Sequence, residues 1–438
     1  MSVRETGSVL ATSKQRNRKV FFGIGAGNAM EWFDWNIYAM FAVFFAPQFF
    51  AGDSQASDLL KTLGVFAVGF VARPFGGLLF GLLADRRGRQ FSMTVAVGLA
   101  AAGSLVIGLT PTHETIGTWA AVMLVVCRMI QGLAHGGELP AAQTYISEMA
   151  PKEKRGLWAS LIYFSGTVGV IGGAVMAAVL SGVLTDAQMS SFGWRIPFVL
   201  GGIFGLFALY LRSRLHETEI FSESSAESEE SGVSLWTQMR EHRGLLLRVV
   251  AMTVGSTVIY YVWAVSAPAY AISVHGVPAS SAMWAGAAAN LVFLVMLPIW
   301  GAISDRIGRR PVMISSGVLL IVLLFPLDWI IQGQAWQLFV AMAIALSLMA
   351  ATASVGPAVF AEMFPTSIRA VGFGLPASLA VAIFGGTAPY LQTLFADKGI
   401  PGVFNWYALV LVAISVSTVV FFVPETVGKD LAATGDRP

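Results

Sequence analysis

Long apolar stretches recur along the whole chain and restrict what it can fold into. A helix needs about 20 mostly apolar residues to cross a hydrocarbon core of about 30 Å. A window of that length finds about twelve such stretches in the 438 residues. They begin near Val20, Leu59, Phe91, Trp119, Gly156, Trp194, Leu246, Ala282, Pro311, Trp336, Ala370 and Gly402. The pattern predicts an all-α membrane protein with twelve transmembrane helices.

The composition supports this prediction. Only 12% of the residues are charged and 56% are apolar, whereas a soluble domain carries roughly a quarter charged residues. This excludes a soluble enzyme, a nucleic-acid-binding protein and a disordered scaffold. The net charge of +2 indicates no polyanionic partner. The single cysteine, Cys127, lies in an apolar stretch and is expected to fill the core.

The basic residues orient the predicted spans. Most of the 27 Lys and Arg residues precede the first span, follow the last, or lie in alternate connections. The exceptions are Lys61, Arg73, Arg128, Arg195 and Lys398. Such an asymmetry places both termini in the cytoplasm. We expect an N-terminal tail (1–19) without a signal peptide, a six-helix bundle (20–215), a solvated acidic linker (216–245), a second six-helix bundle (246–424) and a C-terminal tail (425–438).

Two motifs occur twice, at corresponding ends of spans. Residues 81–90 read GLLADRRGRQ and residues 301–310 read GAISDRIGRR. Residues 148–155 read EMAPKEKR and residues 362–369 read EMFPTSIR. Repeats of this kind are typical of transporters in which two parallel halves rock around a central site.

The repeated motif resembles the loop signature of the major facilitator superfamily. The strings GNAMEWFDWNIY, RPFGGLLFGLLADRRGR, RMIQGLAHGGE, GWRIPF and AEMFPTSIRAVGFG narrow the resemblance to its metabolite:proton symporter branch. Within that branch, GVFAVGFVARPFGG and AIFGGTAPY are similar to the α-ketoglutarate permeases. The resemblance implies two pseudo-symmetric six-helix bundles, alternating access, a functional monomer and a bacterial inner membrane. The partners would be a small-molecule substrate, protons and the lipid bilayer, with no nucleic acid and no cofactor.

The resemblance also implies that charged residues near the cytoplasmic span ends latch one conformation and separate when that side opens. Carboxylates and guanidiniums form short, charge-assisted hydrogen bonds across helix ends. The alternative is simple anchoring by positive charge, without a switch. The first-half members are Gly81, Asp85, Arg86, Gly88, Arg89, Glu148 and Arg155. The second-half members are Asp305, Arg306, Gly308, Arg309, Glu362 and Arg369.

Charged side chains inside the membrane are costly, so they are candidates for proton coupling. Asn28, Glu31 and Asp34 are spaced three residues apart and are expected to share a face of the first span. The resemblance implies that Asp34, or Glu31, pairs with Arg128, and a static salt bridge is the alternative. The proton-coupling candidates are Glu31, Asp34, Arg128, His135 and Glu138. For His135, a satisfied polar core position is the competing interpretation.

The intramembrane arginines favour an anionic substrate, because a guanidinium binds a carboxylate through two parallel hydrogen bonds. The candidate substrate-binding residues are Asn28, Arg73, Arg128, Gln131, Tyr260, Tyr261, Trp263, Asn290 and Tyr390. For the aromatic residues and for Arg73, helix packing is the alternative. No catalytic residue, metal-ligand cluster or nucleotide-binding loop is evident, so an enzyme is not expected.

We therefore predict proton-coupled symport of a small carboxylate, such as α-ketoglutarate or a similar dicarboxylate. The competing hypotheses are symport of shikimate or an aromatic acid, symport of a betaine- or proline-type osmolyte, export, and a transporter-like sensor.

Overall fold

The structure is a computed structural model that describes the backbone of residues 3–50, 54–87, 89–136, 138–213, 239–365 and 368–431. Side chains are described for fewer residues, and those of 1–24, 84–90 and 137–142 are not among them. Within the described part of the chain the elements are helices, with no strand. Most of the predicted linker, 214–238, lies outside the described residues.

The amino-terminal half is a series of helices joined by short connections. They are α1 (Val3–Phe49), α2 (Gln55–Arg87), α3 (Arg89–Leu109), α4 (His113–Ile116), α5 (Trp119–His135), α6 (Glu138–Met149), the 3-10 turn η1 (Lys152–Lys154), α7 (Arg155–Val183), α8 (Asp186–Gln188), the π-helical segment η2 (Met189–Gly193) and α9 (Arg195–Ser213). Helices α5 and α6 together occupy the fourth predicted span. Helix α1 begins at Val3, so the backbone of the predicted tail already belongs to the first helix.

The carboxyl-terminal half repeats this plan with two interrupted spans. Its elements are α12 (Arg243–Tyr260), the π-helical segment η3 (Tyr261–Ser266), α13 (Ala267–His275), α14 (Ala279–Ile307), α15 (Arg309–Ile330), α16 (Ala335–Met363), α17 (Arg369–Ala380), the π-helical segment η5 (Val381–Gly385), α18 (Ala388–Asp397) and α19 (Gly402–Phe422). The series α12–η3–α13 forms one span, and α17–η5–α18 forms another.

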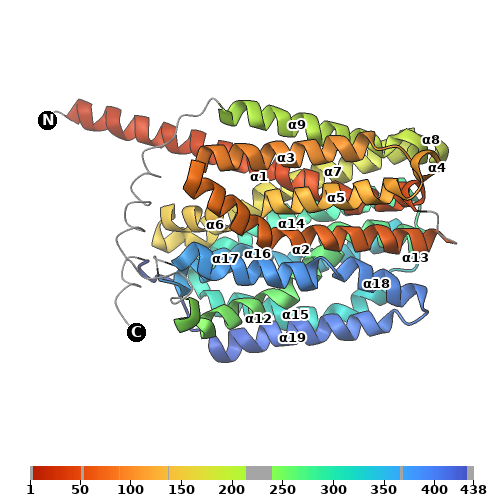
Figure 1. Cartoon of the computed structure of the whole chain (residues 1–438). Coiled ribbons are helices and arrows are strands. Elements are labelled where there is room, and N and C mark those ends of the chain that lie inside the picture. Colours follow the sequence, from red (N-terminus) through yellow and green to blue (C-terminus); the bar gives the residue numbers. More distant parts are fainter. Residues whose placement is uncertain are drawn as a thin grey trace.

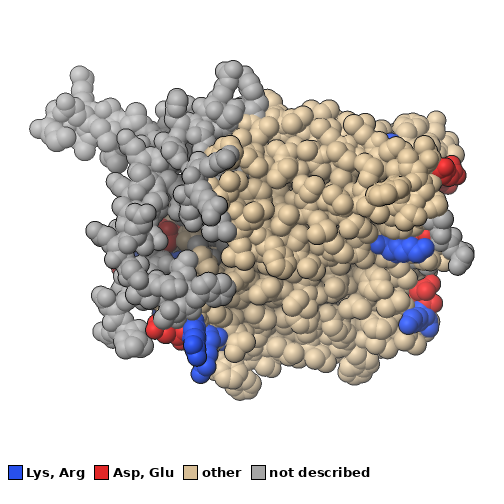
Figure 2. All heavy atoms as spheres, in the orientation of Figure 1, with Lys and Arg blue, Asp and Glu red and all other residues tan. Residues whose placement is uncertain are grey.

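Every predicted span corresponds to one helix or to consecutive helices. Among the described residues, nine helical stretches are long and apolar enough to cross a membrane, by length and composition. Figure 2 shows the matching surface: on the visible face, the coloured charged side chains lie toward the two ends of the bundle, and an uncharged belt separates them. A belt of this kind suits a hydrocarbon environment, where charged side chains are costly.

The helices run side by side, with most of the amino-terminal half above the carboxyl-terminal half in Figure 1. Helix α7 packs against α14 and joins the two halves, while α1 lies on α7 and α16 lies on α14. The start of α1 and the end of α19 lie at the same end of the bundle (Figure 1). Within the first half, α2 and α5 touch through their backbones. A Cβ atom on Gly136 would lie 1.9 Å from the carbonyl oxygen of Arg73, so only glycine permits this approach.

Candidate functional site

A cavity of about 140 Å³ lies between the two halves. Helices α1, α2, α5, α6 and α7 line it from the amino-terminal half. From the carboxyl-terminal half it is lined by α12, η3, α15, α16, α17 and η5. Its polar lining from the first half includes Glu31, Asn36, Arg73, His135 and Gln143. Pockets between helices of a bundle are common places for small-molecule sites.

Arg73 is the arginine that lines this cavity among the described residues. Its guanidinium carbon lies 3.8 Å from the centre of the Trp35 ring and 4.6 Å from that of Phe70. Tyr261 of the other half lines the same cavity and packs edge-to-face on Phe70, with the ring centres 4.9 Å apart. Stacking on aromatic faces fixes the guanidinium plane without using its hydrogen-bond donors. The Nε atom is buried and has no hydrogen-bond partner among the described residues, so Arg73 retains capacity to bind an anion.

Arg128 lies behind the cavity, fully buried. Its guanidinium carbon is 4.1 Å from the centre of the Trp35 ring and 4.4 Å from that of Tyr38. Trp35 therefore contacts both arginines, and Arg128 is not part of the cavity lining.

Gln131 connects Arg128 to Asp34. Arg128 donates to Oε1 of Gln131 over 3.1 Å, and Nε2 of Gln131 donates to Oδ2 of Asp34 over 3.0 Å. Ser104, on α3, donates to the other carboxylate oxygen of Asp34. The expected direct pair between Asp34 and Arg128 is thus wrong for this conformation. Trp35 and Tyr38 hold the Arg128 guanidinium away from Asp34, and the amide of Gln131 lies between the two charged groups.

Glu31 contacts His135, and this contact is an ion pair when the imidazole is protonated. The Nδ1 atom of His135 lies 3.1 Å from Oε1 of Glu31, and both side chains line the cavity. The expected shared face of Asn28, Glu31 and Asp34 is not observed. Each step of three residues turns a helix by about 60° from the starting direction. Asn28 accordingly donates to Ile162 and Ser165 on α7, over 2.8 and 2.9 Å, while Asp34 faces α3 and α5.

Three of the other predicted substrate residues lie outside the cavity lining. Asn290 is buried and donates to the carbonyl oxygens of Ala264 and Gly286, each over 3.0 Å. Trp263 is buried, and Tyr390 packs half-buried against the core. The side chain of Glu138 lies outside the described residues. From the predicted set, the cavity brings together Glu31, Arg73, His135, Tyr260 and Tyr261.

The carboxyl-terminal wall of the cavity is built from hydroxyl and aromatic groups. Tyr260 ends α12 and Tyr261 begins the π-helical segment η3, and their ring centres lie 5.2 Å apart. Val381, the first residue of η5, also lines the cavity. π-Helical turns occur frequently at functional sites. Both interrupted spans therefore present their irregular turn to the same space.

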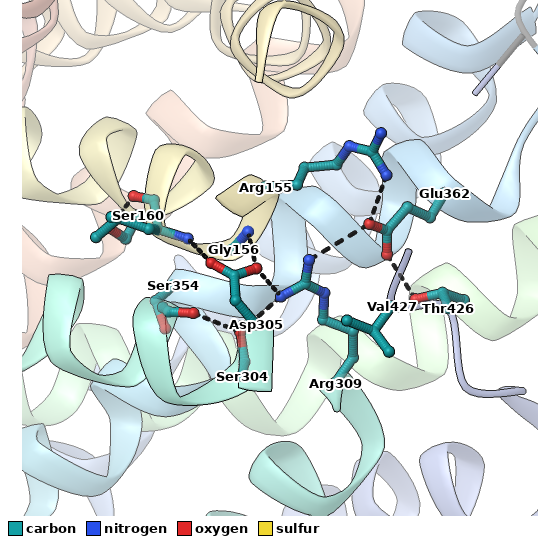
Figure 3. A network of polar contacts seen from close by, with 12 residues as sticks. Arg155, Gly156, Ser160, Ser304, Asp305, Arg309, Ser354, Glu362, Thr426 and Val427 are labelled. Carbon is teal, nitrogen blue, oxygen red and sulfur yellow. Dashed lines mark hydrogen bonds and ion pairs between the residues drawn. The ribbon is translucent and has the colours of Figure 1, made fainter. Parts of the chain in front are cut away.

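A second site, a charged network, joins the halves at one end of the bundle (Figure 3). Arg155, at the start of α7, pairs with Glu362, at the end of α16, over 2.8 Å. Arg369 pairs with Glu148 over 2.5 Å, again between the halves. Asp305 accepts hydrogen bonds from the backbone N–H groups of Gly156 and Leu157, over 2.8 and 2.9 Å. The start of a helix favours a carboxylate in this position.

Arg309 links the members of this network within the second half. It pairs with Asp305 over 2.7 Å and with Glu362 over 3.5 Å. Arg306, by contrast, is exposed. The first-half members Asp85, Arg86, Gly88 and Arg89 lie outside the described side chains, and Gly81 is placed only as part of α2. The sequence placed each cluster within its own half, whereas the described pairs of Glu148 and Arg155 reach into the other half.

The segment after α19 completes the network. Thr426 donates to Oε2 of Glu362 over 2.6 Å, and Arg155 donates to the carbonyl oxygen of Lys429 over 3.0 Å. The carboxylate of Glu425 accepts from the backbone N–H groups of Arg309 and Arg310 over 2.9 and 3.1 Å. Partial burial tends to raise the pKa of Glu425, but these hydrogen bonds to its charged form outweigh it and lower the pKa below its ordinary value.

Comparison with known proteins identifies the family. Residues 20–243 match the family Sugar (and other) transporter, and residues 252–437 match the Major Facilitator Superfamily. The α-ketoglutarate permease of Escherichia coli (strain K12) is 36% identical over 412 residues, which cover 92% of this chain and 94% of the permease. The chain belongs to the major facilitator superfamily.

Other members of the superfamily are similar over nearly the whole length. The ectoine/proline transporter of Corynebacterium glutamicum is 32% identical and aligns over 94% of this chain and 85% of its own. The solved D-xylose-proton symporter superposes with a TM-score of 0.73 at 19% identity, covering 94% of this chain and 99% of the symporter. The predicted fold class, two six-helix halves of a major facilitator protein, is therefore confirmed, and the protein is a membrane transporter and not an enzyme.

Several residues of both sites were missed by the sequence analysis. Ser104 lies in an apolar stretch and carries no distinguishing signal. Trp35 and Tyr163 look like ordinary membrane aromatics, although both line the cavity. Glu425 and Thr426 belong to a segment interpreted only as a tail. The available signal was the pair of polar side chains in Pro424-Glu425-Thr426, because polar residues directly after a span can cap the ends of neighbouring helices.

Proposed function

We propose that this transporter is a secondary active symporter that moves a small carboxylate inward together with protons. The observation that carries the proposal is Arg73, which lines a cavity between the two halves and is held by Trp35 and Phe70. A site between two rocking halves is open to each side of the membrane in turn. A stacked guanidinium there is suited to bidentate binding of a carboxylate.

The proposed substrate is α-ketoglutarate or a similar dicarboxylate. The name of the Escherichia coli relative supports this choice, as does the arginine in the cavity. A zwitterion of the proline or betaine type is the second candidate. It is favoured by Glu31 and by the aromatic side chains Trp32 and Tyr260 on the same cavity, which can bind a cationic group.

Proton coupling is proposed to involve the carboxylates of Glu31 and Asp34. Asp34 is linked through Gln131 to Arg128, so gain or loss of its charge changes how Arg128 is held. An ionised carboxylate is favoured by a nearby guanidinium, and a neutral one by burial. A movement that changes this link therefore also changes whether Asp34 keeps a proton.

The charged network at the ends of α6, α7, α14 and α16 is proposed to be the cytoplasmic gate. Its pairs join the halves, so separation of that end requires breaking them. We further propose that the transporter works as a monomer in a bacterial inner membrane, with both termini in the cytoplasm. The basic residues of the connections support this orientation.

Reconstitution into liposomes with an imposed pH gradient tests the proposal. We expect an inward acid gradient to drive accumulation of labelled α-ketoglutarate, with labelled shikimate and proline as the competing probes. In Asp34→Asn we expect gradient-driven accumulation to be lost while exchange without a gradient remains. Asp397→Asn, on an exposed position near the end of α18, is the control. If no small acid accumulates, or if Asp34→Asn accumulates normally, the proposed symport or the role of Asp34 is wrong.

A further inference from the structure

His135 has a buried nitrogen that the proposed mechanism leaves without a use. Its Nδ1 atom lies 3.1 Å from Glu31, and its side chain is 7% exposed. Its Nε2 atom is buried and has no hydrogen-bond partner among the described residues. Leaving such a group unpaired is energetically unfavourable. A ligand in the cavity that His135 lines would relieve this cost.

His135 and Arg73 lie around the same indole ring. The Arg73 guanidinium carbon is 3.8 Å from the centre of Trp35, and the His135 ring centre is 5.3 Å from Trp35 in an edge-to-face arrangement. The backbones also touch, because Gly136 packs directly on the carbonyl of Arg73. The two nitrogen-bearing groups are therefore neighbours on one wall of the cavity.

Among the described residues, the charges around His135 leave one carboxylate of a dianion without a cation. Arg73 is the permanent cation among the described cavity residues. Arg128 lies behind the aromatic layer, where it is linked to Asp34 through Gln131. Among the described side chains, the titratable and charged groups near His135 are Glu31 and Asp34 on α1, Arg73 on α2, Arg128 on α5, Tyr163 on α7, and Tyr260 and Tyr261 across the cavity.

We propose that His135 is the second carboxylate-binding residue of the site and that it binds only in its protonated form. In the neutral imidazole, an N–H at Nδ1 that donates to Glu31 leaves Nε2 as an acceptor, which repels a carboxylate. In the imidazolium both nitrogens carry a proton, so Nε2 becomes a positively charged donor. One proton and the second carboxylate then bind together. This inference rests on the proposed transport of a carboxylate. It adds how the cavity distinguishes a dicarboxylate from a monocarboxylate.

The binding affinities of dicarboxylates and monocarboxylates should therefore depend differently on pH. A monocarboxylate can bind to Arg73 alone and does not require a proton on His135. A dicarboxylate requires that proton, so its affinity should fall as pH rises and the proton is lost, by up to about tenfold for each pH unit. Its selectivity over a matched monocarboxylate should fall in parallel.

Titration calorimetry on the purified full-length protein in detergent tests this, with α-ketoglutarate and 2-oxobutyrate as probes between about pH 5.5 and pH 8. His135→Gln should lose the preference for α-ketoglutarate and its pH dependence, while binding of 2-oxobutyrate changes less than about threefold. His135→Arg supplies a permanent charged donor and should bind α-ketoglutarate at all these pH values. His275→Gln is the matched control, because its Nε2 is also buried without a described partner but lies outside the cavity lining.

The outcomes distinguish this inference from the proposed function. If the wild-type protein binds both acids and His135→Gln keeps the pH dependence of α-ketoglutarate binding, the inference is wrong and the transport proposal stands. Equal pH dependence for the two acids in the wild-type protein also overturns it. If the wild-type protein binds neither acid, both proposals fail. Should His135→Gln not fold, the wild-type comparison of the two acids and His135→Arg still decide the question.

Discussion

The cavity wall from the amino-terminal half carries charge, whereas the described cavity residues of the carboxyl-terminal half are all uncharged. Glu31, Arg73 and His135 face the cavity from the first half. The second half contributes serine, threonine, tyrosine, phenylalanine, methionine and smaller apolar residues. Because charges are costly at membrane depth, their restriction to one wall supports the proposal that this wall binds the charged parts of the substrate.

The helices that line the cavity also differ between the two halves in how regular their backbones are. The helices α1 and α7 continue past the cavity without interruption, but the spans formed by α12–α13 and α17–α18 contain the π-helical segments η3 and η5. Tyr261 and Val381 lie in these segments and line the cavity. The charged wall has a break of its own, between α5 and α6 directly after His135, but the π-helical turns of the described cavity lining lie on the neutral wall.

The largest effect is expected from removing the cation of the charged wall. Arg73→Ala should lower the initial rate of α-ketoglutarate uptake at subsaturating concentration by about 100-fold, because each hydrogen bond to a charged group contributes about 1.5–3 kcal/mol. Tyr261→Phe, on the neutral wall, should lower it only about fivefold through loss of one hydroxyl. Uptake into proteoliposomes measures both. Equal losses would mean that the two walls share substrate binding, and the comparison would then be wrong.

An intermediate effect is expected at the gate, where the halves contribute charges to common pairs. Glu362 is fully buried and pairs with Arg155, whereas the side chain of Glu148 is 40% exposed in its pair with Arg369. Loss of one partner costs about 3–5 kcal/mol in a fully buried pair. The cost should be smaller for Glu148, because water reaches its carboxylate and the buried Arg369 also donates to the carbonyl oxygens of Phe364 and Leu431. Glu362→Gln should therefore open this end much more than Glu148→Gln.

Thiol labelling can measure that opening. A cysteine in place of Gly356, which lines the cavity and has open space around it, is compared in both variants on a Cys127→Ser background. We expect the labelling rate to rise more than about tenfold with Glu362→Gln and less than about threefold with Glu148→Gln. Similar rates in the two variants would contradict an energetic difference between the pairs.

The smallest effect is expected from Glu425, which lies after the last span and is largely exposed. Its pKa in the folded protein is below the ordinary value of 4.5, so its ionised form stabilises the fold at neutral pH. That contribution is lost as pH falls through the lowered pKa. The difference in melting temperature between wild type and Glu425→Gln should thus be small at pH 7 and disappear in acid. A difference that grows in acid would show that the pKa is raised.

The sequence predicted the architecture well because hydrocarbon imposes a strict length and polarity on each span. The starts expected near Trp119, Gly156 and Gly402 lie within one residue of the observed helices α5, α7 and α19. The repeated motifs also located the charged network, since Asp305, Glu362 and Arg369 are all members of it. What the repeats did not predict is that the pairs cross between halves, because a repeat reports similarity and not contact.

The candidate site was predicted as a set of residues but not as an arrangement. Low charge density reduced the search to a few intramembrane side chains, among which Glu31, Arg73 and His135 line the cavity. Helical spacing grouped Asp34 with Glu31, but small angular differences around α1 direct them to different neighbours. No local pattern identifies Ser104 or Gln131 as the link to Asp34.

By itself, then, the sequence determined a two-half, twelve-span transporter and the residue types available to its centre. These follow from the cost of polar groups in lipid, which acts on each segment separately. Only the tertiary structure decided that Arg128 lies behind Trp35, that Arg73 faces the cavity, and that Glu31 holds His135. Those outcomes depend on helix rotation and on contacts between segments far apart in the chain, which no single stretch of sequence contains.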